Sequence, residues 1–239
     1  LNEWLTTEGE YMNSLLDFED IGETTSCGYC KEVKNALYRC HTCIGGGNTN
    51  YCQRCTVGMH QGTPFHRIAL WNEAAGCFQE TSLCEIGLVI RLGHATPHTA
   101  CPNPGTPLGI TTVHINGVHN TTVQPCNCPS SKLLHLQLFD KRLFPASVHS
   151  PQTVFSFTVL DQFRYFHLEG KGSAYTFMNA IYRLTDDTGC IALQDRVREF
   201  RRIYRQWGSL QRNKASGRYG SSSQVLPLVV ECPACPHPG

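Results

Sequence analysis

The sequence has no apolar run long enough to cross a lipid bilayer, and its first twenty residues contain no Lys or Arg. A secretory signal peptide needs a basic segment followed by an apolar one, and residues 1–20 offer neither. The sequence also shows no internal repeat. We therefore expect a soluble intracellular protein without a membrane partner. With 41% hydrophobic residues it can build an ordinary core.

Large apolar residues are scarce between residues 21 and 66, where Cys, Gly, Thr and Asn dominate. Something other than hydrophobic burial must hold this segment together. The chain has 14 cysteines and 11 histidines, and four of its Cys pairs have the CxxC spacing. That spacing suits chelation of one metal ion better than a mutual disulfide. The pattern therefore favours metal binding under reducing conditions over a disulfide framework.

Three CxxC pairs followed by two histidines form the first candidate metal cluster. The eight ligands are Cys27, Cys30, Cys40, Cys43, Cys52, Cys55, His60 and His66. Eight ligands fill two tetrahedral zinc sites and leave no open position for a catalytic water, so the predicted zinc is structural. His41 lies within the second pair and could compete, but it breaks the pair spacing. Three disulfides or free thiols are the alternative, and neither would give the histidines a role.

A second candidate cluster lies downstream and centres on the stretch QPCNCP. Cys126 and Cys128 are too close in sequence to bridge each other without strain, although both can reach one metal ion. A third zinc bound by His94, Cys101, Cys126 and Cys128 is chemically sensible. His98 is a rival for His94, and Cys77 and Cys84 are weaker substitutes. Plain buried thiols are the alternative, because that is the usual fate of an intracellular cysteine.

The secondary structure changes in character along the chain. Residues 3–18 permit a short amphipathic helix. The runs HRIALW, IGLVIRL, GITTVHI and LLHLQLF are β-like, and VHINGVHNTTVQ predicts a hairpin with Asn116 and Gly117 as its two-residue turn. Beyond Pro151 the pattern becomes helical, in segments that begin TVLDQF, SAYTFM and LQDRVREF. Ser173 is the expected N-cap of the second of these segments.

One concentrated basic element stands out against a formal net charge of only +1. Residues 195–218 contain eight Lys and Arg against two acids, whereas residues 1–20 contain six acids. In the predicted helix, apolar residues recur at helical spacing and leave four arginines mostly on other faces: Arg198, Arg201, Arg202 and Arg205. Exposed arginines can contact DNA phosphates. The alternative is a solvated helix whose charge only serves solubility.

Much of the chain, roughly residues 4–239, resembles the CxC-type cysteine-cluster region associated with KDZ transposases, which are eukaryotic DNA transposases. The resemblance is carried by ALWN, FQETSLCEIGLVIRLGHATPHTACPNP, TTVHINGVHNTTVQPCNC, GSAYTFMNAIYRLTDDTG and ECPACPHPG, among others. It implies ligand positions at His94, Cys101, Cys126 and Cys128. It implies plain thiols at Cys77, Cys84 and Cys190. Cys232 and Cys235 then mark the junction with the transposase core and form half of a site completed beyond Gly239, with His237 as a possible third ligand.

The order of the first eight ligands resembles ZZ-type and B-box zinc modules, in which alternate ligand pairs share one ion. That resemblance implies one zinc on Cys27, Cys30, Cys52 and Cys55, and another on Cys40, Cys43, His60 and His66. The expected fold is then α+β, with a small cross-brace zinc module, a β-rich middle unit holding a third zinc, and a helical C-terminal part. The expected segments are 1–24, an acidic lead helix; 25–72, the zinc module; 73–152, the β-rich unit; 153–213, the helical part; and 214–239, a linker and junction.

The function implied is that of a nuclear, non-catalytic zinc module that assists DNA binding or assembly. The sequence begins without Met and ends in CPACPHPG, so we expect a piece of a longer chain that contains the transposase catalytic domain. The acids that hold magnesium in such transposases are not placed in these residues by the resemblance, and no catalytic residue or small-molecule substrate is expected. The competing hypothesis is a protein-interaction module that binds peptides or histone tails.

Overall fold

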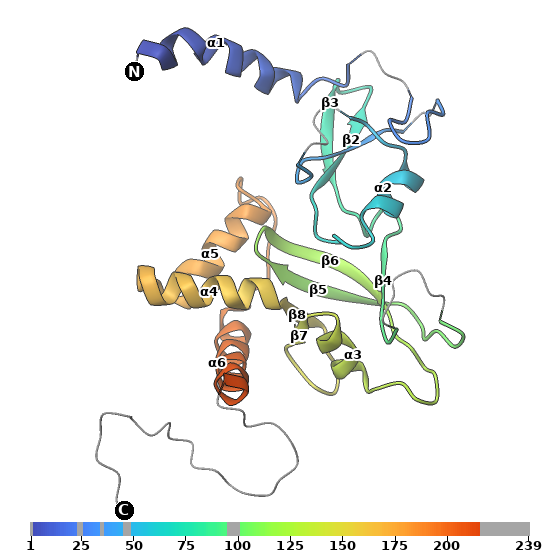
Figure 1. The fold of residues 1–239 in the computed structure, drawn as a ribbon, viewed down its shortest axis with the longest axis vertical. Helices are drawn as coiled ribbons and strands as arrows, with labels where there is room; N and C mark the ends of the chain where they lie inside the picture. The colour runs from blue at the N-terminus through green and yellow to red at the C-terminus, as the bar shows by residue number, and fades with distance from the viewer. Residues whose placement is uncertain (1, 23–25, 34–35, 45–48, 95–100, 216–239) are drawn as a thin grey trace, which may run out of the picture. The chain divides into compact units, whose positions relative to one another are not determined.

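The computed structural model describes residues 2–22, 26–33, 36–44, 49–94 and 101–215. Six helices and two β-sheets occur in these residues, which confirms the expected α+β class. By contacts the chain separates into two compact units, Leu1–Ile203 and Tyr204–Gly239. Both sheets and the first five helices lie in the first unit, shown in Figure 1. The five segments expected from sequence stay a prediction.

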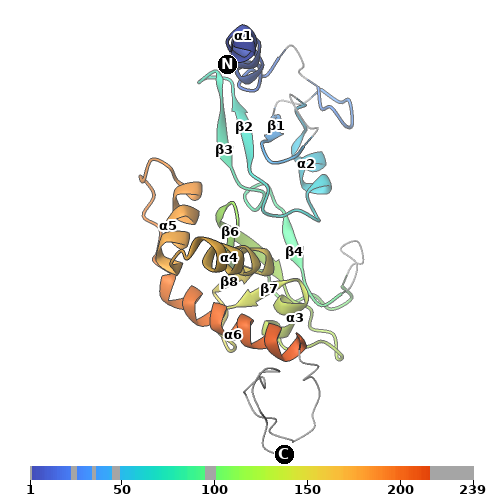
Figure 2. The same cartoon turned by 60° about the vertical axis from the view of Figure 1, so that its left-hand side comes forward.

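The first sheet is small and antiparallel, with strand order β1 (Tyr38–Cys40), β2 (Ile68–Asn72) and β3 (Cys77–Thr81). The short helix α2 (Gln53–Met59) belongs to the same region, as Figure 2 shows. Its core holds few side chains: Tyr38, Cys40, Ile68, Leu83, Ile86 and Leu88. A core this small supports the expectation that hydrophobic burial does not hold the region alone.

The second sheet has five strands in the order β4-β6-β5-β8-β7. Their bounds are Val89–Arg91 for β4, Leu108–His114 for β5, Gly117–Gln124 for β6, Leu143–Pro145 for β7 and Thr153–Ser156 for β8. Strands β5 and β6 form the predicted antiparallel hairpin. Strand β4 pairs with β6 in parallel, with Arg91 opposite Gln124. Because parallel strands end at the same edge of a sheet, the segments that follow β4 and β6 emerge side by side.

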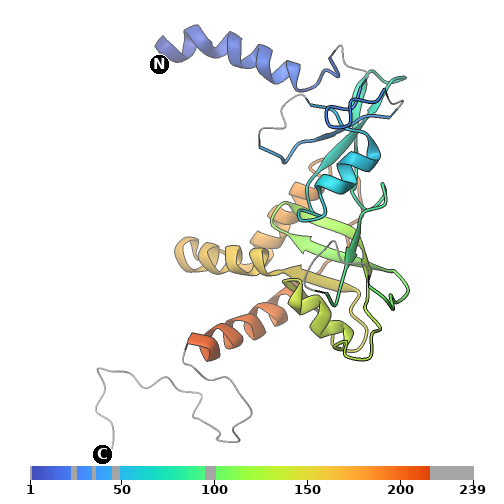
Figure 3. The same ribbon diagram turned by 45° about the vertical axis from the view of Figure 1, so that its right-hand side comes forward.

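The two faces of this sheet are covered by different helices. Ile110, Val123 and Val154 lie on one face and form a core with Leu138 of α3 (Leu134–Asp140), which lies beside β7 in Figure 3. On the other face, α4 (Phe157–Gly170) packs on β5 and β8, and α5 (Ala174–Thr185) packs on β6. Phe155 contacts Phe200, which lies in the first turn of α6 (Val197–Ala215).

Most of the predicted helices are confirmed. Helix α1 (Asn2–Asp17) matches the amphipathic segment, and α4, α5 and α6 match the three helical segments beyond Pro151. The Ser173 side chain accepts a hydrogen bond from the Thr176 backbone N–H at 3.0 Å, so it caps α5 as expected. Strand β8 differs from the prediction, because the pattern beyond Pro151 favours helix whereas Thr153–Ser156 pairs with β5 and β7.

Two local predictions were wrong. The run LLHLQLF forms α3 rather than a strand. Gln137 and Leu138 are both buried although they are adjacent, which a helix allows and strand alternation does not. The hairpin turn is Ile115–Asn116, one residue earlier than expected, and Gly117 begins β6 with φ of 142°. A Cβ at Gly117 would lie 2.6 Å from an Arg67 guanidinium nitrogen, so the close approach requires glycine.

No helix among the described residues is long and apolar enough to cross a membrane.

Candidate metal centres

The first cluster combines a loop knuckle with the start of a helix. Cys27 and Cys30 flank a tight turn in which the Lys31 N–H donates to the Cys27 carbonyl at 2.9 Å. Cys52 directly precedes α2 and Cys55 lies in its first turn. The Cys52 N–H donates to the Cys27 Sγ at 3.3 Å, and the Cys30 and Cys52 sulfurs are 3.9 Å apart. Four thiols from two segments therefore converge.

The second cluster joins the end of β1 to the end of α2. Cys40 ends β1, and His60 follows the last residue of α2. The Cys43 sulfur lies 3.4 Å from His60 Nε2 and 3.3 Å from His66 Nδ1, and Cys40 Sγ lies 3.6 Å from the same His66 nitrogen. His60 Nδ1 is 2.8 Å from the Thr56 carbonyl oxygen, to which it can donate. That bond leaves Nε2 free as a metal ligand, which is the usual arrangement around metal-bound histidine.

The third cluster arises from the parallel pairing of β4 with β6. Because Arg91 lies opposite Gln124, His94 and Cys126 follow the same edge of the sheet and meet there. His94 Nε2 lies 3.4 Å from Cys126 Sγ and 3.9 Å from Cys128 Sγ, and the Cys128 sulfur lies 3.7 Å from that of Cys101. Gly93, with φ of 80°, permits this approach, since a Cβ there would lie 2.3 Å from the Cys126 Cβ.

A buried amide holds the CNC loop of this third cluster in place. The Gln137 Oε1 accepts from the Cys126 N–H at 2.9 Å, and the Gln137 Nε2 donates to the Cys126 carbonyl at 2.9 Å. The side chain is only 3% exposed. Gln137 is thus a positioning residue that the sequence did not reveal. A polar residue on the buried face of a helix was the signal, and the assignment of LLHLQLF to a strand obscured it.

The three groups fit a four-coordinate metal ion. In each group the four ligand atoms lie within 4.8 Å of one another. A tetrahedral zinc with bonds of about 2.3 Å to sulfur and about 2.0 Å to nitrogen separates its ligand atoms by about 3.5–3.8 Å. The sulfur–sulfur distances of 3.7 and 3.9 Å match that spacing and exceed the bond length of a disulfide, about 2.05 Å. All cysteines in the described residues are free thiols.

Thiols packed this closely compete for protons. Burial opposes ionisation of Cys27, but backbone N–H groups, led by that of Cys52, outweigh it and lower the pKa of this thiol to about 6. Burial and the neighbouring cysteines raise the pKa of Cys55 to about 12. In the third group, the hydrogen bond with Cys126 and then burial raise the pKa of Cys128 to about 11. A bound cation would favour thiolates in both members of each pair.

The four-residue groups are those expected from sequence. They are Cys27, Cys30, Cys52 and Cys55; Cys40, Cys43, His60 and His66; and His94, Cys101, Cys126 and Cys128. His41, Cys77, Cys84 and Cys190 belong to no such group in the described residues. Cys84 instead lies 3.0 Å from the Thr122 hydroxyl. His98, Cys232, Cys235 and His237 lie outside the described residues, so their predicted roles stay predictions.

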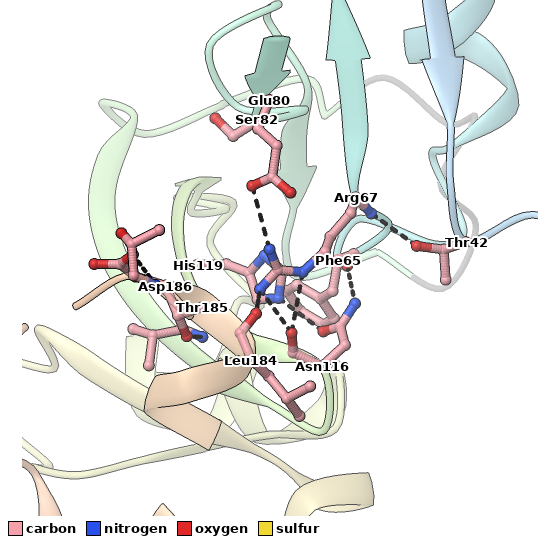
Figure 4. Close-up of polar contacts among 12 residues, drawn as sticks. Thr42, Phe65, Arg67, Glu80, Ser82, Asn116, His119, Leu184, Thr185 and Asp186 are labelled. Carbon is pink, nitrogen blue, oxygen red and sulfur yellow. Dashed lines mark hydrogen bonds and ion pairs between the residues drawn. The ribbon is translucent and has the colours of Figure 1, made fainter. Parts of the chain in front are cut away.

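A polar joint connects the second cluster to the five-stranded sheet. Arg67, which follows the ligand His66, donates to the Asn116 carbonyl oxygen at 3.2 and 2.9 Å and also to the Leu184 carbonyl oxygen. Figure 4 shows its guanidinium between Asn116, Leu184 and Glu80. The Asn116 side chain returns a hydrogen bond to the Phe65 carbonyl at 2.7 Å. The second cluster is therefore fixed to both the hairpin turn and the end of α5.

The four predicted DNA-contact arginines of α6 are exposed. Arg198, Arg201 and Arg205 lie on the helix face opposite the buried Phe200, within an arc roughly 100° wide that also includes Arg202. Among the described residues, the guanidiniums of Arg198, Arg201 and Arg205 have no hydrogen-bond or ion-pair partner. Arg202 donates to the Ala146 carbonyl at 2.6 Å.

Comparison with known proteins identifies one part of the chain. Residues 83–189 match the family model described as "CxC2 like cysteine cluster associated with KDZ transposases". The match includes all four residues of the third cluster, while the first two clusters precede it. No curated protein and no solved structure matches the chain. Residues 83–189 therefore form a CxC2-like, KDZ transposase-associated cysteine-cluster domain, preceded by two further clusters that could hold metal ions.

Proposed function

We propose that this chain is a zinc-stabilised, non-catalytic part of a KDZ-type transposase and that it binds DNA. The description of the matching family supports the association with a transposase. Zinc is supported by the donor sets, which are four sulfurs, two sulfurs with two imidazoles, and three sulfurs with one imidazole. Each set already offers four ligands, which is typical of closed structural zinc sites. The catalytic domain would then lie elsewhere in a longer chain, and the protein would act in the nucleus.

The arginine row of α6 is the observation that carries the DNA proposal. Arg198, Arg201 and Arg205 share one exposed face and make no ion pair with any described residue. Arginines without carboxylate partners are free to contact phosphates, which provide most of the sequence-independent affinity for DNA. The row follows one helix face, so its charges are spaced along a line rather than clustered at one point.

The test is the salt dependence of DNA binding. Zinc-loaded protein is titrated into a fluorescently labelled duplex at several salt concentrations, and anisotropy gives the dissociation constant. Replacing Arg198, Arg201 and Arg205 together by Ala should weaken binding and reduce the slope of log K against log salt by about 2–3, because each lost phosphate contact contributes about 0.9. The matched control replaces three other exposed arginines, Arg54, Arg164 and Arg183.

The control separates a specific surface from net charge, since both triple variants lose the same charge. Equal losses in the two variants would contradict the α6 surface, and salt-independent or absent binding by the unmodified protein would contradict DNA binding altogether. A change in unfolding temperature would expose an indirect effect of either variant.

Helix α1 supports a second candidate function, the binding of a basic peptide such as a histone tail. Its large apolar residues are exposed, with Trp4 at 52%, Leu5 at 61% and Leu16 at 60%, and its remaining surface carries acids. A basic segment with apolar side chains would complement both features. Calorimetry with a Lys- and Arg-rich peptide tests it. Peptide binding that Leu5→Ser and Leu16→Ser abolish, together with absent DNA binding, would favour this function over the first.

A further inference from the structure

One face of the five-stranded sheet has an apolar half and an open polar half. Strand register places Thr111, Val113, Phe155 and Thr153 on the same face, because Thr111 pairs with Thr153 and Val113 with Phe155. Val113 and Phe155 are fully buried, and Phe155 contacts Phe200. The two threonines line a groove with a cavity volume of about 640 Å³. The helices that cover the apolar half therefore leave the polar half accessible.

The groove presents hydrogen-bond donors. Arg196, just before α6, donates from Nε to the Thr153 hydroxyl and from a terminal nitrogen to the Thr111 hydroxyl, both at 3.3 Å. A hydroxyl that accepts from a guanidinium keeps its own O–H available to donate to another group. Asn120, opposite Thr111 on β6, is exposed, and its side-chain amide has no hydrogen-bond partner among the described residues. Three donors from neighbouring strands therefore point to one space.

The charge of the lining favours an anion. Arg196 and Arg202 line the groove, and Glu199 is the one acid among its lining residues. Arg202 also lies within the exposed arc of α6 that holds Arg198 and Arg201, so these arginines adjoin the groove. A ligand that accepts several hydrogen bonds and carries negative charge satisfies both the donors and the guanidiniums. Phosphate meets these requirements, and guanidinium with hydroxyl donors is a common way to hold it.

We propose that this groove binds phosphate, and that its occupant is a phosphate of the DNA backbone. The proposal rests on the DNA-binding function above and extends it: the row of α6 would guide the strand, and Arg196, Thr111 and Asn120 would seat one phosphate. A small phosphate compound has the same chemistry and is the other possible source. The arms of the experiment therefore separate the two.

The decisive variant is Asn120→Asp. It is nearly isosteric, sits at an exposed position and places a negative charge in the groove without touching Arg196 or the α6 row. One added like charge several ångströms from a phosphate should weaken its binding roughly tenfold. The matched control is Asn13→Asp, which adds the same charge on the exposed surface of α1. Thr111→Val, which removes one donor and keeps the side-chain shape, is the second variant.

Two titrations of the zinc-loaded full chain are compared, one with labelled duplex DNA and one with inorganic phosphate. The phosphate titration is followed by the NMR signals of the Asn120 amide and the Arg196 Nε–H. If the proposal holds, Asn120→Asp weakens DNA binding about tenfold and Thr111→Val weakens it less, while Asn13→Asp leaves it unchanged. Inorganic phosphate should then shift the two signals and compete with DNA.

The outcomes separate this proposal from the DNA-binding function itself. DNA binding that depends on the α6 row but not on Asn120 or Thr111 overturns the groove and leaves the function standing. Phosphate binding at the groove in a protein that does not bind DNA supports a small phosphate ligand and overturns the DNA occupant. If neither DNA nor phosphate binds, both proposals fail. Equal weakening by Asn120→Asp and Asn13→Asp would reduce the effect to net charge and also overturn the groove.

Discussion

The guanidinium of Arg67 donates two hydrogen bonds to the carbonyl oxygen of Asn116, 49 residues further along the chain. Its terminal nitrogen also reaches the Leu184 carbonyl, and Gly117, the first residue of β6, leaves room for it. Because Arg67 directly follows the candidate ligand His66, its side chain anchors the second cluster to the five-stranded sheet. This relationship gives the first prediction.

Replacing Arg67 by Ala should lower the free energy of unfolding of the zinc-loaded protein by about 2–3 kcal/mol. The change removes charge-assisted hydrogen bonds and leaves the partly buried Asn116 carbonyl without the Arg67 donor. Urea denaturation followed by circular dichroism measures it. Arg54→Ala, at an exposed arginine of α2, is the control and should change stability by less than about 0.5 kcal/mol. Equal losses of stability in Arg67→Ala and Arg54→Ala would mean that the Arg67 hydrogen bonds do not stabilise the fold.

The purified protein should contain three zinc ions per chain, one for each four-ligand group in the described residues. Cys128→Ser should reduce the content to two, because it removes a ligand from the third group only. Elemental analysis of protein purified without added chelator gives the count. The control is Cys190→Ser, at an exposed thiol outside every group, which should keep all three ions. Two ions in the unmodified protein would contradict the third site.

Gln137→Ala should weaken zinc binding at the third site by about 10–100-fold, which is the usual effect of losing a residue that orients metal ligands. The Cys126 N–H and carbonyl would lose their partner, and the CNC loop would be less well positioned. Competition with a chromophoric chelator measures the affinity. Gln79→Ala, at an exposed glutamine of β3, should leave it unchanged. Unaltered affinity in Gln137→Ala would limit the residue to a packing role.

Stability should fall as the pH decreases from about 6.5 toward 4. Burial lowers the pKa of His119 to about 4, with smaller contributions from His114 and Arg67, and burial also lowers that of His114 to about 4. Both histidines therefore stay neutral in the folded protein where the unfolded chain, with a histidine pKa of about 6.5, already binds protons. Proton binding then favours the unfolded state between about pH 6.5 and 4. Above about pH 6.5 the histidines are neutral in both states and no longer change the stability.

Between pH 7 and pH 5.5, the His119→Gln variant should lose about 1 kcal/mol less of its free energy of unfolding than the unmodified protein loses. The measurement is urea denaturation at the two pH values with excess zinc, and metal analysis confirms that the sites stay loaded. His149→Gln, at an exposed histidine, is the control and should keep the full pH dependence. If both variants lose stability with pH as the unmodified protein does, proton uptake occurs elsewhere.

Local chemistry made part of the fold predictable. The Ser173 cap and the helical periodicity of α5 and α6 depend on residues a few positions apart, so the sequence revealed them. LLHLQLF was ambiguous, because seven apolar-rich residues fit a short strand as well as a short helix. Only packing decides between them, and packing against Ile110, Val123 and Val154 chose the helix. The turn at Asn116 was misplaced for a similar reason, since Arg67 approaches from a distant segment.

The sequence by itself determined which cysteines pair on one metal ion in the N-terminal clusters, because CxxC spacing fixes two sulfurs on one side of a turn regardless of the rest of the fold. Which pairs share an ion was implied by the resemblance to ZZ-type and B-box modules, and the packed chain brings those pairs together. The sequence proposed the four ligands of the third cluster but left plain buried thiols as the alternative, and only the tertiary structure showed that they converge. Its ligands meet because β4 and β6 run parallel and end at one edge of the sheet, and no local spacing encodes that. The Gln137 clamp, the Arg67 joint and the polar groove likewise depend on contacts between distant segments, which only the packed chain establishes.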